Sequence, residues 1–139
     1  MLALLLGCSE AADPLDARAL GRQFPEQADA ILRGPFAFTL AGDAFESLRT
    51  VDALVGLSGE TGLRSRFPPG GDGAVRFPLP DGSEVEVREL GVLGKAAVAE
   101  NAISYARRGG TSFWTALDDG YEEWLLVEAS AVRRDAPVA

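Results

Sequence analysis

The sequence predicts a mainly β fold, an antiparallel β-sandwich-like domain with a short helical segment near its N-terminal end. The chain has 16 glycines and 8 prolines in 139 residues, and so many turn-forming residues favour short strands over long helices. Two dipeptides, Asp81-Gly82 and Asp119-Gly120, each separate two runs of β-prone residues. That pattern is the strongest short-range signature of a hairpin. Helical spacing of apolar residues is clearest in residues 15–34.

Composition narrows the classes of function. A net charge of −8 argues against nucleic acid as a partner, because phosphate binding needs a basic surface. The chain contains no histidine and a single cysteine, which excludes a Ser-His-Asp or Cys-His site, a cysteine-based zinc site and an internal disulfide. Enzymes built on a carboxylate pair, on Ser-Lys or on tyrosine stay open as alternatives, and our expectation is no enzymatic activity, no cofactor and no metal.

The helical segment consists of two pieces. Apolar residues from Leu15 to Leu20 form the first piece, which ends before Pro25. Pro25 then opens the second piece, which stops at Gly34 and Pro35. We expect the segment to cover one end or edge of a sheet through a buried stripe of Phe24, Ala28, Ile31 and Leu32.

Short strands are predicted in residues 36–40, 63–67, 74–79 and 83–90. Two alternatives stay open for residues 43–55, a helix or two short strands around a turn. Asp43 and Glu46 have the capping-box spacing that begins a helix. In the last of the predicted strands the alternation points Val85 and Val87 inward and their charged neighbours outward. That alternation slips at Glu89-Leu90, which indicates a bulge or the end of the strand.

Residues 103–128 contain both tryptophans and both tyrosines and form the clearest hairpin. If Asp119-Gly120 is a two-residue loop, Thr115 lies opposite Trp124 and Trp114 lies opposite Leu125. Both faces of this hairpin are then apolar, so we expect it to lie between two layers. The arginine pairs Arg107-Arg108 and Arg133-Arg134 are interpreted as solvated strand ends.

Three groups of residues are candidate sites. The acidic pairs Asp118-Asp119 and Glu122-Glu123 lack the six to eight oxygens that calcium needs, and we interpret them as turn and strand-end acids. The loop 70–73 lacks the lysine of a phosphate-binding loop. Four aromatic side chains offer a glycan-stacking platform as an alternative function, although aromatic residues at alternating strand positions usually form core. They are Tyr105, Trp114, Tyr121 and Trp124.

The first residues resemble a bacterial lipoprotein signal. Leu5-Leu6-Gly7-Cys8 matches the box in which the cysteine becomes a lipidated N-terminus, and Ser9 resembles the outer-membrane sorting choice. The preceding apolar run is short and has no basic region, as in a truncated signal; the alternative is a chance match in a cytoplasmic protein. The resemblance implies lipidation at Cys8 and a position on the outer membrane, at its periplasmic or surface side.

Residues 100–127 resemble a β-rich segment near the N-termini of large bacterial surface proteins of the Rhs/YD-repeat type. The resemblance implies a β-sandwich module at the start of a larger exported protein, with further domains or other envelope proteins as partners. We therefore divide the chain into a truncated signal and tether (1–14), a helical segment (15–34) and a β-sandwich-like domain (35–139) that continues if the chain is a fragment. The matching positions are Asn101, Ile103, Tyr105, Gly109-Gly110, Phe113-Trp114, Gly120, Glu122-Glu123 and Leu125-Leu126-Val127.

The expected function is thus a non-catalytic, lipid-anchored structural or interaction module of the cell envelope. The alternative is a β-sandwich module that binds a glycan or another ligand.

Overall fold

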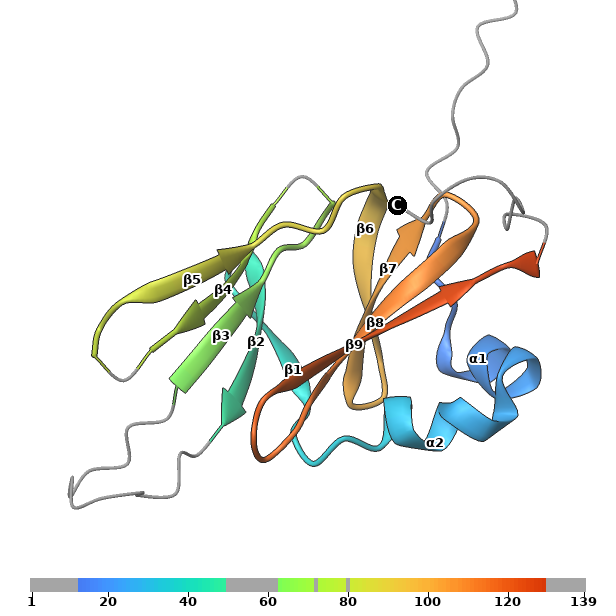
Figure 1. Ribbon diagram of the computed structural model, residues 1–139, viewed down its shortest axis with the longest axis horizontal. Helices are drawn as coiled ribbons and strands as arrows, with labels where there is room; N and C mark the ends of the chain where they lie inside the picture. Colours follow the sequence, from blue (N-terminus) through green and yellow to red (C-terminus); the bar gives the residue numbers. More distant parts are fainter. Residues whose placement is uncertain (1–12, 50–62, 72, 80, 130–139) are drawn as a thin grey trace, which may run out of the picture.

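The described residues form two antiparallel sheets and two short helices, arranged as in the computed structural model of Figure 1. The structure describes residues 13–49, 63–71, 73–79 and 81–129. Strands β1 to β5 form one sheet and β6 to β9 the other, each in sequence order. The predicted mainly β, two-sheet fold is therefore confirmed. The elements are α1 (Ala17–Gln23), α2 (Pro25–Leu32), β1 (Phe38–Ala41), β2 (Ala44–Arg49), β3 (Leu63–Phe67), β4 (Val75–Pro78), β5 (Glu84–Val87), β6 (Val92–Ala99), β7 (Ala102–Arg107), β8 (Gly110–Ala116) and β9 (Tyr121–Val127).

Both helices lie within the predicted segment 15–34, although α1 begins two residues after the expected start and α2 ends at Leu32. The carboxylate of Asp16 accepts a hydrogen bond from the amide of Ala19 at 2.6 Å and caps α1. Pro25 occupies the first position of α2, where its missing N–H costs nothing. The helices pack on a face of the four-stranded sheet, rather than on an end or edge. Their contact joins Leu20, Ala28, Ile31 and Leu32 to Ala99, Ala102, Phe113 and Leu126.

The opposite face of that sheet packs against the inner face of β1 to β5. Phe67 lies at the centre of this second core, with its ring centroid 4.8 Å from that of Phe38 and 5.7 Å from that of Trp114. Both neighbours meet Phe67 edge to face, the preferred geometry for aromatic pairs. The four-stranded sheet is thus the middle layer of the molecule, between the helices and the other sheet.

Backbone contacts also join the two sheets along their margins. Phe36 forms an isolated bridge with Ala116 of β8. At another margin the loop after β3 pairs with the irregular part of β6, where Gly70 bridges Lys95 and the amide of Ala96 donates to the carbonyl of Pro69 at 2.9 Å. These bonds satisfy loop backbone groups and fix the spacing of the two layers.

The structure corrects the register of the β8–β9 hairpin. Phe113 lies opposite Trp124 and Trp114 opposite Glu123, two residues from the predicted pairing. The reason is that the turn is centred on Asp118-Asp119, one residue earlier than predicted, so that Leu117 lies opposite Gly120 and the amide of Leu117 donates to the carbonyl of Gly120 at 2.9 Å. Because a two-residue shift preserves which side chains share a face, the expected coverage by two layers is confirmed.

Two further expectations are settled in the first sheet. Residues 44–49 form strand β2 and Asp43 lies in the turn before it, while residues 50–55 lie outside the described residues. Val85 was expected to point into the core, yet its side chain is 44% exposed. The reason is that the β4–β5 hairpin extends past the four-stranded sheet, as Figure 1 shows.

Candidate functional site

The four aromatic residues do not form an exposed platform. Tyr105 is 2% exposed and Trp114 is 6% exposed, and both lie in the core between the sheets. Tyr121 packs at the edge of that core, whereas Trp124 lies on the opposite face of the sheet beside the helices. Glycan stacking needs accessible ring faces on one surface, so this arrangement contradicts the predicted platform.

The most concentrated polar chemistry lies instead around Glu89, in the connection that passes from β5 to β6. Its side chain is 6% exposed. One carboxylate oxygen accepts hydrogen bonds from Ser112 Oγ at 2.6 Å and Arg107 Nη1 at 2.8 Å, and the other accepts one from Trp114 Nε1. Three donors from the second sheet therefore bind a buried carboxylate that lies on the connection leading out of the first sheet. We call Glu89, Arg107, Ser112, Trp114 and Glu123 the Glu89 cluster.

Strand alternation places these donors together. Ser112 and Trp114 are two residues apart on β8 and so project from the same face of the sheet. Tyr105 pairs directly with Ser112, and Arg107 follows two residues later on β7. That face is the one against which the first sheet packs, so a side chain entering from the β5–β6 connection meets all of them.

Arg107 departs most clearly from its predicted role. Its side chain is only 11% exposed, and its second terminal nitrogen donates to the carbonyl of Leu90. Glu123 approaches the guanidinium from β9 at 3.5 Å. The interpretation of Arg107 as a solvated strand end is therefore wrong, because two carboxylates and a carbonyl surround it. Arg108 is exposed as expected, and Arg133-Arg134 lies outside the described residues.

Burial and the charge of Glu89 shift the pKa values of Glu123, within the cluster, and of Tyr105, beside it. The pKa of Glu123 is raised, mainly by burial and then by the nearby charge of Glu89, while Arg107 opposes the shift. The pKa of Tyr105 is raised strongly, chiefly by burial and secondly by Glu89. Its hydroxyl donates to the carbonyl of Pro68 at 2.9 Å, so the phenol remains a neutral donor that holds the loop after β3.

Little space adjoins this cluster. A cavity of about 10 Å³ lies between Glu89, Tyr105, Val92 and the glycine-rich loop, which is room for about one water molecule. Among the described residues, the cluster can therefore hold the two sheets together but cannot admit a substrate. Sequence reasoning missed Glu89, although its signal was present in the slip of the alternation at that residue.

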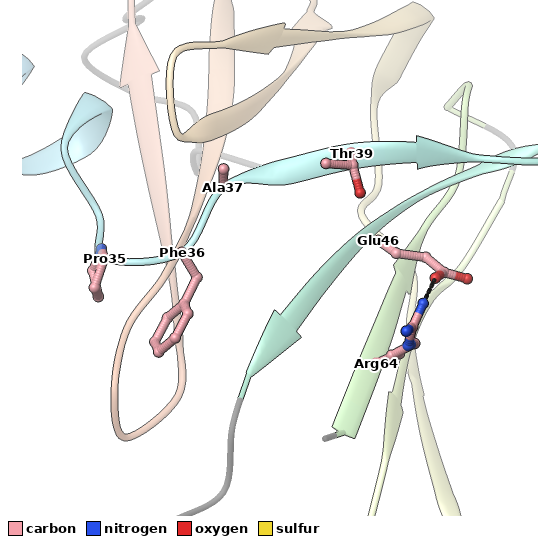
Figure 2. Close-up of a pocket in the computed structure, with 6 residues that line it drawn as sticks. All are labelled: Pro35, Phe36, Ala37, Thr39, Glu46 and Arg64. Carbon is pink, nitrogen blue, oxygen red and sulfur yellow. Dashed lines mark hydrogen bonds and ion pairs between the residues drawn. The ribbon is translucent and has the colours of Figure 1, made fainter. Parts of the chain in front are cut away.

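In the described part of the first sheet, two hollows open at the surface. The larger, of about 370 Å³, has an apolar side formed by Pro35, Phe36 and Ala37. Its polar side includes Glu46 and Arg64, joined at 3.4 Å across neighbouring strands (Figure 2). The smaller, of about 230 Å³, includes Arg66 and Arg76. Both hollows are open to solvent.

The remaining candidates are dispersed. Asp118, Asp119 and Glu122 are exposed at or near the hairpin loop, whereas Glu123 turns toward Arg107. In the described ranges, no three Asp, Glu, Cys or His side chains are grouped so that they could hold a metal ion. Cys8 lies outside these ranges.

Comparisons with protein-family models, with curated proteins and with solved structures found no match for this chain. As far as the structure describes the chain, it contains no helix long and apolar enough to cross a bilayer.

Proposed function

We propose that the chain is a non-catalytic structural or interaction module of the bacterial cell envelope, anchored by a lipid at Cys8 and facing the periplasm or the cell surface. The observation that carries the non-catalytic part is the closure of the Glu89 cluster. Its carboxylate accepts three hydrogen bonds and adjoins a cavity of about 10 Å³. A general acid or base must reach the proton that it transfers, and Glu89 is enclosed by its partners.

The cluster supports a structural role because it links the two sheets. Glu89 enters from the β5–β6 connection, whereas Ser112 and Trp114 belong to β8. Removing one member of such a buried charged group is costly, since the other members keep their charge or lose their hydrogen bond. These residues therefore hold the β5–β6 connection against the second sheet.

The anchor is supported by the resemblance of Leu5-Leu6-Gly7-Cys8 to a lipoprotein box. The amide of Leu15 donates to Thr111 Oγ1 at 3.2 Å, which ties the start of the described chain to β8. Between Cys8 and Leu15 the chain reaches at most about 25 Å. A lipid on Cys8 would thus hold the helical layer close to the membrane surface. The resemblance to Rhs/YD-repeat-type proteins further supports a place at the start of a larger surface protein.

The anchor is tested by fractionating cells of the native bacterium. Wild-type protein is expected in the membrane fraction, and Cys8→Ser protein, which has no thiol to acylate, is expected to shift to the soluble fraction. Ser9→Ala is the matched control and is expected to remain membrane-bound. Equal distribution of wild type and Cys8→Ser would contradict the anchor.

A second candidate function, the binding of a small ligand, is favoured by the larger hollow. Its apolar side near Phe36 and the exposed guanidinium of Arg64 suit a molecule that carries a carboxylate beside an apolar group. Saturation-transfer NMR with benzoate and phenylacetate tests this candidate. Binding that Arg64→Gln abolishes would support it, and the absence of transfer to either probe would contradict it.

A further inference from the structure

We propose that the free edge of β5 binds an extended peptide segment of another envelope protein, in which basic and apolar residues alternate. This inference rests on the proposed role as an interaction module and specifies the chemistry of the partner. β5 is the last strand of its sheet, and β4 is its hydrogen-bonded neighbour in the part of the chain that the structure describes. Figure 1 shows this strand at the outer margin of the molecule. Addition of a strand to such an edge is a common mode of peptide recognition.

The backbone groups available at this edge belong to the two glutamates of the strand. The amide of Leu79 donates to the carbonyl of Ser83 at 2.8 Å, so these two residues form a hydrogen-bonded pair. In an antiparallel ladder, hydrogen-bonded and non-hydrogen-bonded pairs alternate. Val85, two residues after Ser83, therefore directs its backbone toward β4. The backbone N–H and C=O groups of Glu84 and Glu86 consequently point to the free edge.

The charges on the outer face specify a basic partner. A row of facing residues crosses the sheet as Glu46, Arg66, Arg76 and Glu86, and it ends with a carboxylate at the free edge. Arg76 lies 3.1 Å from Glu86 and 3.9 Å from Glu84, so two carboxylates share its guanidinium. Basic side chains on an added strand would lie opposite these glutamates and continue the row.

The inner face of the same hairpin specifies apolar residues between the basic ones. Val85 is 44% exposed and Leu79 is 40% exposed, because the β4–β5 hairpin extends past the second sheet. Alternate residues of an added strand would cover this apolar surface. A second copy of this chain fits less well, since pairing β5 with itself would bring Glu84 and Glu86 of both copies together.

The test uses the full 139-residue chain labelled with ¹⁵N and three blocked peptides. The probe is Thr-Arg-Val-Arg-Val-Arg-Thr, and the controls are Thr-Glu-Val-Glu-Val-Glu-Thr and a peptide of the probe's composition with its three arginines consecutive. We expect the probe to shift the amide signals of Glu84 and Glu86 and to bind about tenfold more tightly than either control. Added salt should weaken this binding.

Matched variants locate the site. Glu86→Lys should weaken probe binding about tenfold, because it replaces an attraction by a repulsion. Glu122→Lys makes the same charge change on the edge strand β9 and should change the affinity less than about twofold. Absence of probe binding, equal binding of the acidic peptide, equal effects of the two variants, or dimerisation of the chain through β5 would each overturn the inference. Membrane fractionation of Cys8→Ser tests the anchor independently of this result.

Discussion

Replacement of Glu89 by glutamine tests whether the Glu89 cluster stabilises the fold. The substitution keeps the shape of the side chain but removes its charge and one of its two acceptor oxygens. In the native protein one oxygen serves Ser112 and Arg107, and the other serves Trp114. The amide of the new glutamine can preserve only one of these two arrangements, so at least one buried donor loses its partner.

The magnitude follows from the burial of the group. The Glu89 side chain is 6% exposed and that of Arg107 is 11% exposed, so solvent compensates little for the lost contacts. An orphaned buried donor costs about 1–3 kcal/mol, and breaking a buried ion pair costs about 3–5 kcal/mol. Glu123 remains near Arg107 and retains part of the attraction. We therefore expect Glu89→Gln to lower the free energy of unfolding by about 3 kcal/mol.

Urea denaturation followed by tryptophan fluorescence measures this change, with the m-value checked for two-state behaviour. Glu86→Gln is the matched control, because Glu86 pairs with Arg76 at the exposed surface and its loss should cost less than about 0.5 kcal/mol. The double variant Glu89→Gln/Arg107→Met should be less destabilised than the sum of its single variants, since the two residues contact each other. A loss below about 1 kcal/mol for Glu89→Gln, or no excess over the control, would refute the reasoning.

Two further predictions concern protonation and close backbone packing. Because the pKa of Glu123 is raised in the folded state, the folded protein holds this proton more tightly than the unfolded chain, and its contribution to stability falls as pH rises. Glu123→Gln should therefore gain stability relative to wild type in urea titrations as the pH is raised above the ordinary pKa of a glutamate, 4.5. A Cβ on Gly71 would lie 2.7 Å from the carbonyl oxygen of Val92. Gly71→Ala should therefore lower the free energy of unfolding by about 1–3 kcal/mol. Gly21 in α1 has open space around it, and Gly21→Ala should raise the free energy of unfolding by about 0.5–1 kcal/mol in the same urea denaturation assay.

A specific result would contradict the prediction for Glu123→Gln, and another would contradict the predictions for the two glycines. A relative stability of Glu123→Gln that is constant or falls with rising pH would show that Glu123 does not bind its proton more tightly in the folded state. Equal and small effects of the two glycine substitutions would show that the loop after β3 does not lie against β6 as closely as the structure places it.

The helices and the hairpin faces could be predicted because they depend on residues close together in the sequence. Pro25 separates two helical pieces whatever they pack against, because it lacks an N–H. The period of two in a strand fixes which side chains of β8 and β9 share a face. The hairpin register was not determined, because Asp119-Gly120 suits a two-residue loop, while a turn centred one residue earlier, on Asp118-Asp119, keeps the same alternation.

The remaining differences depend on contacts between residues far apart in the sequence. Val85 alternates correctly for an inward position, but only the extent of the second sheet decides whether that position is covered. Glu89 resembles the exposed acids that precede it, and its burial arises when one sheet packs on the other. Arg107 likewise becomes enclosed only because Glu89 and Glu123 converge on it from two other segments. Such convergence has no signature in local composition.

The proposed anchor at Cys8 is tested most directly by intact mass spectrometry of the protein purified from membranes of its native bacterium. A lipid-anchored envelope module predicts a mature chain that begins at Cys8 and carries the mass of covalently attached acyl chains. A mature protein in which Cys8 is unmodified, with the residues before it retained, would contradict the proposal.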